Sequence, residues 1–581
     1  MRGSPADPSP RRQPGLPFLL PEAPVAVTDT RPTPALVSQR AAERLPRLAL
    51  LLFCAAYLLP GLFGRDPWKN ADIAAYGYMT SLLRGDSDWL HPSLAGLAAE
   101  GGVLPYWIGA GAMALLTPLG LDPALAARIP FTLLLAATMA LVWYATLHLA
   151  RTEAAQPLAF AFGGEAHPID YARAIADGAL LALIAALGLL QLGHETTPDL
   201  VQLAATALLL YGLAASPYRP WQGRIAVLLA PALLAASGAA TTGLLLALAG
   251  TLISHRSSYA DARRQVPWLL MGAALAVLTA TVLETWAWRL AVLEDPASLL
   301  RLLLWFTWPV WPLAGWTLWR WRRQLLKRHL SVPLSVLVIA LSASVGMGGS
   351  DRALMLALPA LAIMAAFALP TLRRSVSAAI DWFSVFFFSA CALTVWVIYL
   401  SMHLGIPAQP ARNIARLAAG FQPVFQPLAL VAALAGSLAW LALVHWRTGR
   451  HRQALWKSLV LPAGGVALSW LLTMTLLLPV LDYARSYRPL VSQIATHVPP
   501  GSCLIAPEFS RSQLAALEVH GHWTLARDPR RTDCRWMVAV HRMPAGARMQ
   551  TPPTPQGWML HDRVRRPTDR DEVILIYRRK S

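Results

Sequence analysis

Long apolar runs recur along the chain between residues 48 and 481, separated by short polar connections. A hydrocarbon core about 30 Å thick is crossed by about 20 apolar residues in a helix, and most of the runs approach that length. We therefore expect an α-helical polytopic membrane protein with about 13 transmembrane helices. The runs lie near 48–63, 128–150, 176–195, 199–215, 225–239, 243–254, 267–290, 303–319, 331–347, 353–370, 381–402, 425–445 and 459–481.

Basic residues concentrate in every second connection between these runs, for example at Arg219 and Arg224 and again at Arg263 and Arg264. Cytoplasmic loops of membrane proteins carry such an excess of Lys and Arg. The first run lies deep in the chain behind Arg47, so it is interpreted as a retained anchor and not as a cleaved signal peptide. An odd number of spans then predicts a multi-pass protein of the bacterial inner (plasma) membrane, with the N-terminus cytoplasmic and the C-terminus periplasmic.

Composition agrees with this prediction. Hydrophobic residues make up 56% of the 581 residues and charged residues 14%, with a mean hydropathy of +0.45. Soluble domains have about 45–50% apolar and about 25% charged residues, so a soluble globule is excluded. The 50 Lys and Arg outnumber the 31 Asp and Glu, which gives a net charge of +19. Their place in alternate connections accounts for much of this excess, and we expect membrane lipids and no nucleic acid as partners.

The two ends of the chain differ from the middle. Residues 1–45 are rich in Pro and Arg and predict a disordered cytoplasmic tail, whereas 46–482 form the transmembrane module. Residues 483–581 are polar enough to fold in water and predict a small periplasmic α/β domain. Its expected elements are strands at 502–507, 535–540 and 573–577, the last able to pair with 558–560, and a helix at 510–519.

Cys503 and Cys534 both lie in this predicted outer domain. An oxidising compartment would allow them to form a disulfide. Two buried free thiols are the alternative, and the sequence leaves both open.

The connection at 65–127 is too long to be a simple loop and mixes charged residues with Trp and Tyr. Aromatic residues of this kind favour the membrane–water interface. We therefore expect interfacial helices in this first periplasmic loop. The apolar stretch 103–119 belongs with them, because a span there would invert the alternation of every later basic connection.

Several motifs occur in an order that resembles a known family. Trp68, Asp72 and Tyr76 precede a Gly85-Asp86…Trp89 turn, and Arg128-Ile129-Pro130 opens the next span. Asp199 begins a later span, a Trp-Pro-rich segment lies at 305–316, and an Arg…Pro-Ala-Leu segment at 352–361. Together these resemble the GT-C class of membrane glycosyltransferases, in particular the protein O-mannosyltransferase and lipid A aminoarabinose transferase family. The chain departs from the family where a second acid and two lysine motifs are common, reading Ile73, Gly101-Gly102-Val103 and Thr242-Gly243.

The resemblance implies a GT-C-like fold and a glycosyltransferase. Its donor would be a polyprenyl-phosphate sugar and its acceptor lipid A, another glycolipid, a polysaccharide or a protein. Asp72 and Asp199 are the implied catalytic residues, Asp72 as general base. The implied substrate and phosphate ligands are Arg65, Lys69, Tyr76, Glu195, Arg301 and Arg352.

Simpler interpretations of these residues stay open. Asp72 and Asp199 could each cap the helix that follows, and Glu195 could lie at a solvated helix end. The arginines could extend to lipid headgroups. No metal site is identified, and a divalent metal requirement is left open. The rival functions are a transporter or flippase for lipid-linked sugars and a non-catalytic binder of them.

Overall fold

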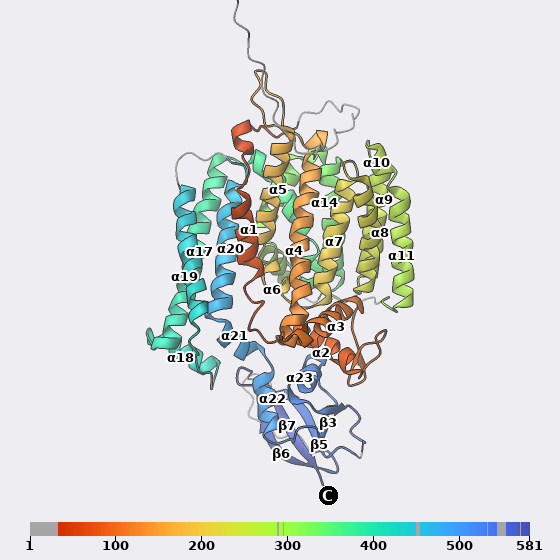
Figure 1. Cartoon of the computed structure of the whole chain (residues 1–581), viewed down its shortest axis with the longest axis vertical. Helices are drawn as coiled ribbons and strands as arrows, with labels where there is room; N and C mark the ends of the chain where they lie inside the picture. The colour runs from red at the N-terminus through yellow and green to blue at the C-terminus, as the bar shows by residue number, and fades with distance from the viewer. Residues whose placement is uncertain are drawn as a thin grey trace, which may run out of the picture.

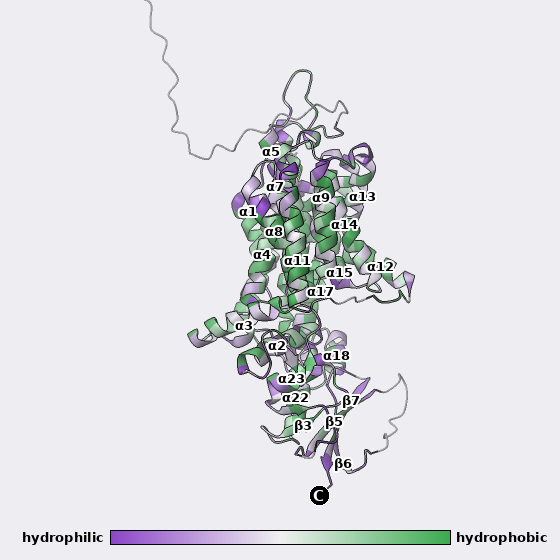
Figure 2. Cartoon of the chain, turned by 90° about the vertical axis from the view of Figure 1, so that its right-hand side faces the viewer, coloured by the Kyte–Doolittle hydropathy of each residue, from purple (hydrophilic) through white to green (hydrophobic). Residues whose placement is uncertain are grey.

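The structure is a computed structural model that describes residues 33–286, 290–293, 295–448, 454–531, 533–542, 554–569 and 571–580. A helical bundle forms most of the molecule, and a small domain with a β-sheet lies at one end of it (Figure 1). Apolar residues dominate the middle of the bundle, whereas polar residues gather at its two ends and in the small domain (Figure 2). The predicted fold class, a helical polytopic membrane protein with a small C-terminal α/β domain, is confirmed.

Seven helical stretches of the described residues are long and apolar enough to cross a membrane, fewer than the 13 expected. Shorter apolar helices occupy most of the other predicted runs. The long stretches are α4 (Pro123–Ala150), α7 (Pro198–Ala215), Ala260–Val282 with α11 (Val266–Val282), α14 (Arg328–Gly346), α17 (Arg374–Leu404), α19 (Pro427–Thr448) and α20 (Lys457–Leu476). The shorter ones include α1 (Arg47–Leu58), α8 (Pro220–Ala236), α9 (Ala240–His255), α12 (Pro296–Phe306) and α16 (Leu358–Ala368).

Several predicted runs are interrupted, and the breaks in two of them contact each other. The run expected at 176–195 is α5 (Pro168–Ala185) followed by the short α6 (Leu189–Leu192). The run expected at 303–319 is divided between α12 and α13 (Val310–Arg320), because the chain leaves the helix at Thr307. Both breaks meet, since the N–H groups of Leu187 and Gly188 donate to the carbonyls of Trp308 and Phe306.

Small residues allow the helices to approach closely, as is common in membranes. At the contact of α8 with α11, a Cβ built on Gly272 would lie 2.5 Å from the Val227 carbonyl oxygen, so only glycine fits.

The segment before α1 differs from the expected disordered tail. Residues 1–32 of that tail lie outside the described residues, but Ala35 and Val37 are buried. The Leu45 N–H donates to the buried Asp177 carboxylate at 3.1 Å, and Arg44 pairs with Asp170 at 2.7 Å. These contacts hold the segment against α5. The sequence did not indicate this, because only a few apolar residues in a Pro-rich stretch become buried.

The first long connection contains α2 (Ala71–Arg84), a hairpin of β1 (Ser93–Leu94) and β2 (Leu97–Ala98), and α3 (Leu104–Leu116). Both helices lie at the end of the bundle that faces the small domain (Figures 1 and 2). The apolar stretch 103–119 therefore does not run through the bundle.

The C-terminal domain begins after α21 (Leu478–Arg485) and carries α22 (Arg488–Ala495) and α23 (Arg511–Gly521) beside a five-stranded sheet. The strand order is β4-β3-β5-β7-β6, with β3 (Cys503–Ile505) parallel to β4 (Thr524–Ala526) and to β5 (Trp536–Arg542). β7 (Glu572–Arg579) is antiparallel to β5 and β6 (Trp558–Val564). All predicted elements are present, and sequence patterning missed α22 and β4. Cys503 and Cys534 form a disulfide.

Candidate functional site

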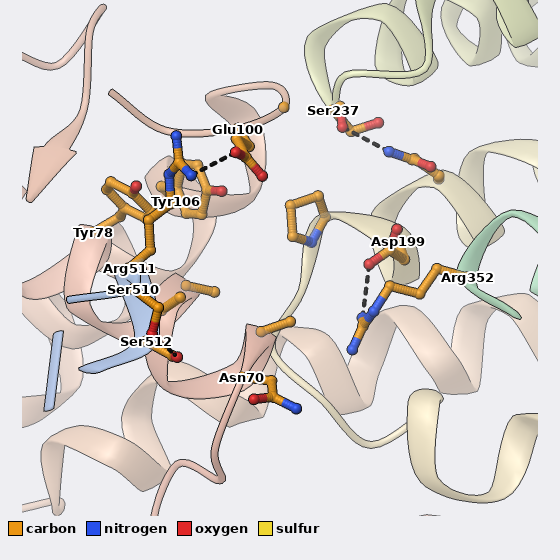
Figure 3. Close-up of a pocket in the computed structure, with 16 residues that line it drawn as sticks. Asn70, Tyr78, Glu100, Tyr106, Asp199, Ser237, Arg352, Ser510, Arg511 and Ser512 are labelled. Atoms are coloured by element: carbon orange, nitrogen blue, oxygen red, sulfur yellow. Dashed lines mark hydrogen bonds and ion pairs between the residues drawn. The ribbon is translucent and has the colours of Figure 1, made fainter. Parts of the chain in front are cut away.

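A cavity of about 410 Å³, called here the first cavity, opens where three parts of the chain meet. The bundle contributes Asp199 at the start of α7 and Arg352 in α15 (Asp351–Met355), and the first connection contributes α2 and Glu100. The C-terminal domain supplies the start of α23 (Figure 3). The polar side chains that line it are Asn70, Tyr78, Glu100, Tyr106, Asp199, Gln202, Ser237, Arg352, Ser510, Arg511 and Ser512.

Arg352 joins two carboxylates on one side of the first cavity. Its Nη1 donates to Asp199 Oδ2 at 2.8 Å, and its Nη2 donates to Glu195 Oε2 at 2.6 Å. The side chains of Arg352 and Asp199 are 26% and 19% exposed, whereas that of Glu195 is 6% exposed and lies behind them. Burial raises the pKa of the Glu195 carboxyl, although Arg352 acts in the opposite direction. The two accessible groups are therefore one carboxylate and one guanidinium, bound to each other.

Arg511 closes the opposite side of the first cavity (Figure 3). Its Nη1 lies 2.5 Å from Glu100 Oε1, and its Nε donates to the Ala98 carbonyl at 3.3 Å. Because Arg511 begins α23 and Glu100 belongs to the first connection, this ion pair fastens the C-terminal domain to the membrane module beside the cavity.

Asp72 is buried and does not line the first cavity. Oδ1 accepts hydrogen bonds from the Thr196 N–H and Oγ1, and Oδ2 accepts from the Trp68 N–H and from Arg65 Nη2. Burial by itself would raise the pKa of Asp72, but Arg65, Arg128 and Thr196 together hold that pKa below its usual range. Asp72 is thus a buried, ionised carboxylate with four donors.

The helical period of α2 explains why Asp72 and the first cavity are separated. Ala71, Ala74, Ala75 and Tyr78 share the face that lines the first cavity, as residues three and four apart on a helix do. Asp72 and Tyr76 lie on another face, and Tyr76 lines a second cavity of about 490 Å³. Arg65 also lines this second cavity, so two expected substrate ligands lie apart from Asp199 and Arg352.

The remaining candidates lie outside both cavities. Lys69 lines neither, and its backbone N–H donates to the Arg485 carbonyl. Arg301 has a side chain that is 71% exposed and pairs with Asp295 at 3.4 Å. The capping alternative also fails, because the N-cap positions of α2 and α7 are Asn70 and Thr197 and both aspartates lie inside the first turn.

Three polar residues that line the first cavity, Gln202, Ser237 and Arg511, were not predicted from the sequence. Gln202 lies one turn after Asp199, a spacing that could have been read from the helix period. Ser237 and Arg511 carry no such indication, because they reach the first cavity only through the packing of α8 and of the C-terminal domain.

A metal site finds no support at either cavity. Among the described residues, the group of His, Cys, Asp or Glu ligands close enough to share an ion is Cys503, Asp533 and Cys534. The disulfide occupies both sulfur atoms of that group.

Comparison with known proteins identifies the fold. No family model and no curated protein matches the sequence. Among solved structures, ArnT from Cupriavidus metallidurans in the apo state matches with a TM-score of 0.56 at 15% identity, over 91% of this chain and 97% of that chain. The same protein bound to undecaprenyl phosphate matches with a TM-score of 0.53 at 14% identity, over 91% and 96%. The chain therefore shares the fold of ArnT over nearly its whole length.

Proposed function

We propose that this protein is a glycosyltransferase that moves a sugar from a polyprenyl-phosphate donor to an acceptor bound at the first cavity. The observation that carries the proposal is the meeting of Asp199 and Arg352 at a cavity at the end of the bundle, on the fold of ArnT. The acceptor class, whether glycolipid such as lipid A, polysaccharide or protein, is left to experiment.

The two accessible groups fit the chemistry of the transfer. The bond between the sugar C1 and the phosphate oxygen breaks, and its electron pair stays on the phosphate. A bond forms between C1 and the acceptor oxygen, and the acceptor proton passes to Asp199 as general base. Arg352 offsets the charge that develops on the leaving phosphate. One cation about 4 Å from such a charge contributes roughly 4 kcal/mol at an effective dielectric near 20.

Asp72 serves this reaction as a positioning residue and not as the base. It binds Thr196, and Thr197 accepts a hydrogen bond from Arg352 Nη1 at 3.3 Å. Glu195 and Asp199 flank these two threonines in sequence and both bind Arg352. Asp72 therefore fixes the segment that holds the two carboxylates around Arg352. Both of its own oxygens accept hydrogen bonds from the protein, so they are not available to take a proton from an acceptor.

We further propose the bacterial inner membrane as location, with the C-terminal domain in the periplasm. The connection with Arg256, Arg263 and Arg264 contains α10 (Ala260–Arg263), which lies at the end of the bundle opposite to the C-terminal domain (Figure 1). Positive residues favour the cytoplasmic side, and a disulfide is stable in an oxidising compartment. Labelling of single cysteines introduced at Arg264 and at Arg531, with a reagent that does not cross membranes, tests this orientation. Labelling of the Arg531 position alone in intact spheroplasts is expected.

The test of function is a comparison of lipid and polysaccharide extracts, by mass, from cells with and without the protein. A mass increase by one sugar on an acceptor is expected, and Asp199→Asn should abolish it. Asp295→Asn is the matched control, because Asp295 is exposed, is the N-cap of α12 and does not line the first cavity, and Asn can also serve as an N-cap. A transporter would instead move an unaltered lipid-linked sugar, and a non-catalytic binder would retain it. Either result with unchanged acceptor masses contradicts the proposal.

A further inference from the structure

One strand in the sheet of the C-terminal domain extends beyond its neighbour. β3 pairs with β5 through Leu504 with Trp536 and Ile505 with Met537, and then ends. β5 continues to Arg542, and β7 pairs with it over this whole length on the other side. Among the strands of the described residues, the stretch 538–542 of β5 therefore has a neighbour on one side only, and its other side is called here the open edge.

The hydrogen bonds to β7 show which backbone groups face the open edge. The Arg579 N–H donates to the Arg535 carbonyl at 2.9 Å, so Arg535 and every second residue after it direct their N–H and C=O groups to β7. The residues in between direct theirs to the open edge, among them Val540 and Arg542. No described residue forms a hydrogen bond with the backbone of either one on that side. Unpaired donors and acceptors of this kind are a template for another strand.

A cavity of about 380 Å³, called here the third cavity, lies next to the open edge. Val540 and Arg542 line it from β5. Glu508 lines it from the connection that follows β3, and Ser510 and Gln513 line it from the start of α23. Glu508 and Arg542 give this lining one charge of each sign, which suits the uncharged main chain of a peptide. Space for a further segment of chain is therefore present beyond the end of β3.

The third cavity also adjoins the first cavity. Ser510 is exposed and lines both of them, and Figure 3 shows it beside Arg511 and Ser512 at the first cavity. A segment that lies along the open edge and continues past Ser510 therefore reaches the space that Asp199 and Arg352 line.

We propose that the open edge of β5 binds an extended polypeptide segment by strand addition, and that this segment belongs to a protein acceptor. Strand addition pairs the main chain of the edge with the main chain of the ligand, so it favours a peptide over a glycan or a lipid. The assignment rests on the proposed function, in which a Ser or Thr hydroxyl of the bound segment enters the first cavity. The hydroxyl oxygen bonds to the sugar C1 and its proton passes to Asp199, while the electron pair of the broken bond stays on the leaving phosphate.

Mass spectrometry of tryptic peptides from cells with and without the full-length protein tests the acceptor class, beside the lipid and polysaccharide extracts. A mass increase by one sugar on peptides with Ser or Thr is expected. Val540→Pro removes an N–H from the open edge and leaves the bonds to β7 in place, because Val540 directs its N–H away from β7. It should lower protein glycosylation about tenfold, as loss of a main-chain hydrogen bond implies. Val540→Thr keeps the N–H and is the matched control.

Glu508→Trp is a second test that does not depend on the folding of Val540→Pro. Glu508 is exposed, and a bulky side chain at this position obstructs the third cavity, so a similar loss of protein glycosylation is expected. Binding is measured on the purified full-length protein with the synthetic, unglycosylated form of a modified peptide. At about ten times its Kd this peptide should slow hydrogen exchange of the amides at 538–542 about tenfold in the wild type and in Val540→Thr. No such change is expected in Glu508→Trp at the same peptide concentration.

The outcomes separate this inference from the proposed function. Sugar transfer to a lipid or a polysaccharide with unmodified proteins overturns the protein acceptor and leaves the proposed function intact. Absence of transfer to every acceptor class overturns both. Equal protein glycosylation in the wild type, Val540→Pro and Glu508→Trp overturns the open edge as the docking site. Slow exchange at 538–542 that depends on protein concentration, without added peptide, would place a second copy of this chain on the edge and would also contradict the proposal.

Discussion

Thr196 donates two hydrogen bonds to a single oxygen of Asp72, from its backbone N–H at 2.9 Å and from its Oγ1 at 2.7 Å. The two residues lie 124 positions apart in the chain. This contact ties the helix that follows the first span to the segment in front of α7, and thereby connects the two stretches that carry the predicted acids.

Replacement of Thr196 by Val removes the hydroxyl donor while the shape of the side chain is kept. We expect the free energy of unfolding to fall by about 1–3 kcal/mol, because a buried carboxylate oxygen loses one of its donors. Chemical unfolding in detergent measures the change. Thr196→Ser retains the hydroxyl donor, so its free energy of unfolding should fall by clearly less. Equal losses in the two variants would count against this role of the hydroxyl.

Replacement of Asp72 or Asp199 by Asn should have different effects on stability and on sugar transfer. Asp72→Asn leaves the buried Arg65 without its counter-charge, and a loss of about 3–5 kcal/mol in the free energy of unfolding is expected. Asp199→Asn alters a more accessible pair and should cost about 1 kcal/mol or less, yet abolish transfer. Unfolding and sugar transfer are measured on both variants. A stable but inactive Asp72→Asn together with an active Asp199→Asn would return the role of base to Asp72.

The docking of the C-terminal domain depends on a glycine of α2. A Cβ built on Gly77 would lie 2.5 Å from the Cβ of Ala515 in α23. Gly77→Ala should therefore weaken docking by about 1–3 kcal/mol through overpacking. Limited proteolysis of the domain measures the change. Gly111→Ala is the matched control in α3, because its Cβ would meet nothing within 4 Å, and a small stabilisation is expected there instead. If both variants resist protease as well as the wild type does, the close contact of Gly77 with Ala515 does not determine how tightly the domain docks.

Docking should also depend on pH through Glu518 of α23. Burial and the neighbouring Asp86 raise the pKa of this carboxyl to about 7, from a usual value of 4.5. The folded state then binds a proton more tightly than the unfolded state does. The contribution of Glu518 is complete below pH 4.5 and is lost as the pH rises to about 7.

Hydrogen exchange of α23 between pH 5 and pH 8 measures this loss after correction for intrinsic exchange. We expect protection to fall by up to about tenfold per pH unit until about pH 7 and then to level off. Glu518→Gln should flatten the profile. His520 cannot produce it, since burial lowers its pKa to about 4. A profile that is unchanged in Glu518→Gln would assign the effect to another group.

The general architecture could be read from the sequence because two strong physical constraints act on it. Apolar length predicts where helices cross, and the alternation of basic connections placed 103–119 outside the bundle. Glu195, Asp199 and Arg352 could be grouped for the same reason, since each lies at the same end of a predicted span.

Side-chain direction in the first connection could not be read in this way. Arg65 and Tyr76 were expected beside Asp199, but both line the second cavity, and for Tyr76 the rotation of α2 is the reason. That rotation is determined by the packing of α2 against α23, a contact between residues more than four hundred positions apart for which the sequence carries no local indication. The glycines that replace the family's lysine motif have a steric explanation of the same kind, because a Cβ on Gly102 would overlap the Ala236 carbonyl.

The start of α23, which completes the first cavity, follows all the helices of the bundle in the sequence. During synthesis all the membrane helices emerge from the ribosome before Ser510, Arg511 and Ser512 do. A nascent chain therefore has the bundle's carboxylates and arginine long before it has an enclosed chamber around them. The proposed activity therefore depends on a segment that is synthesised after the membrane helices.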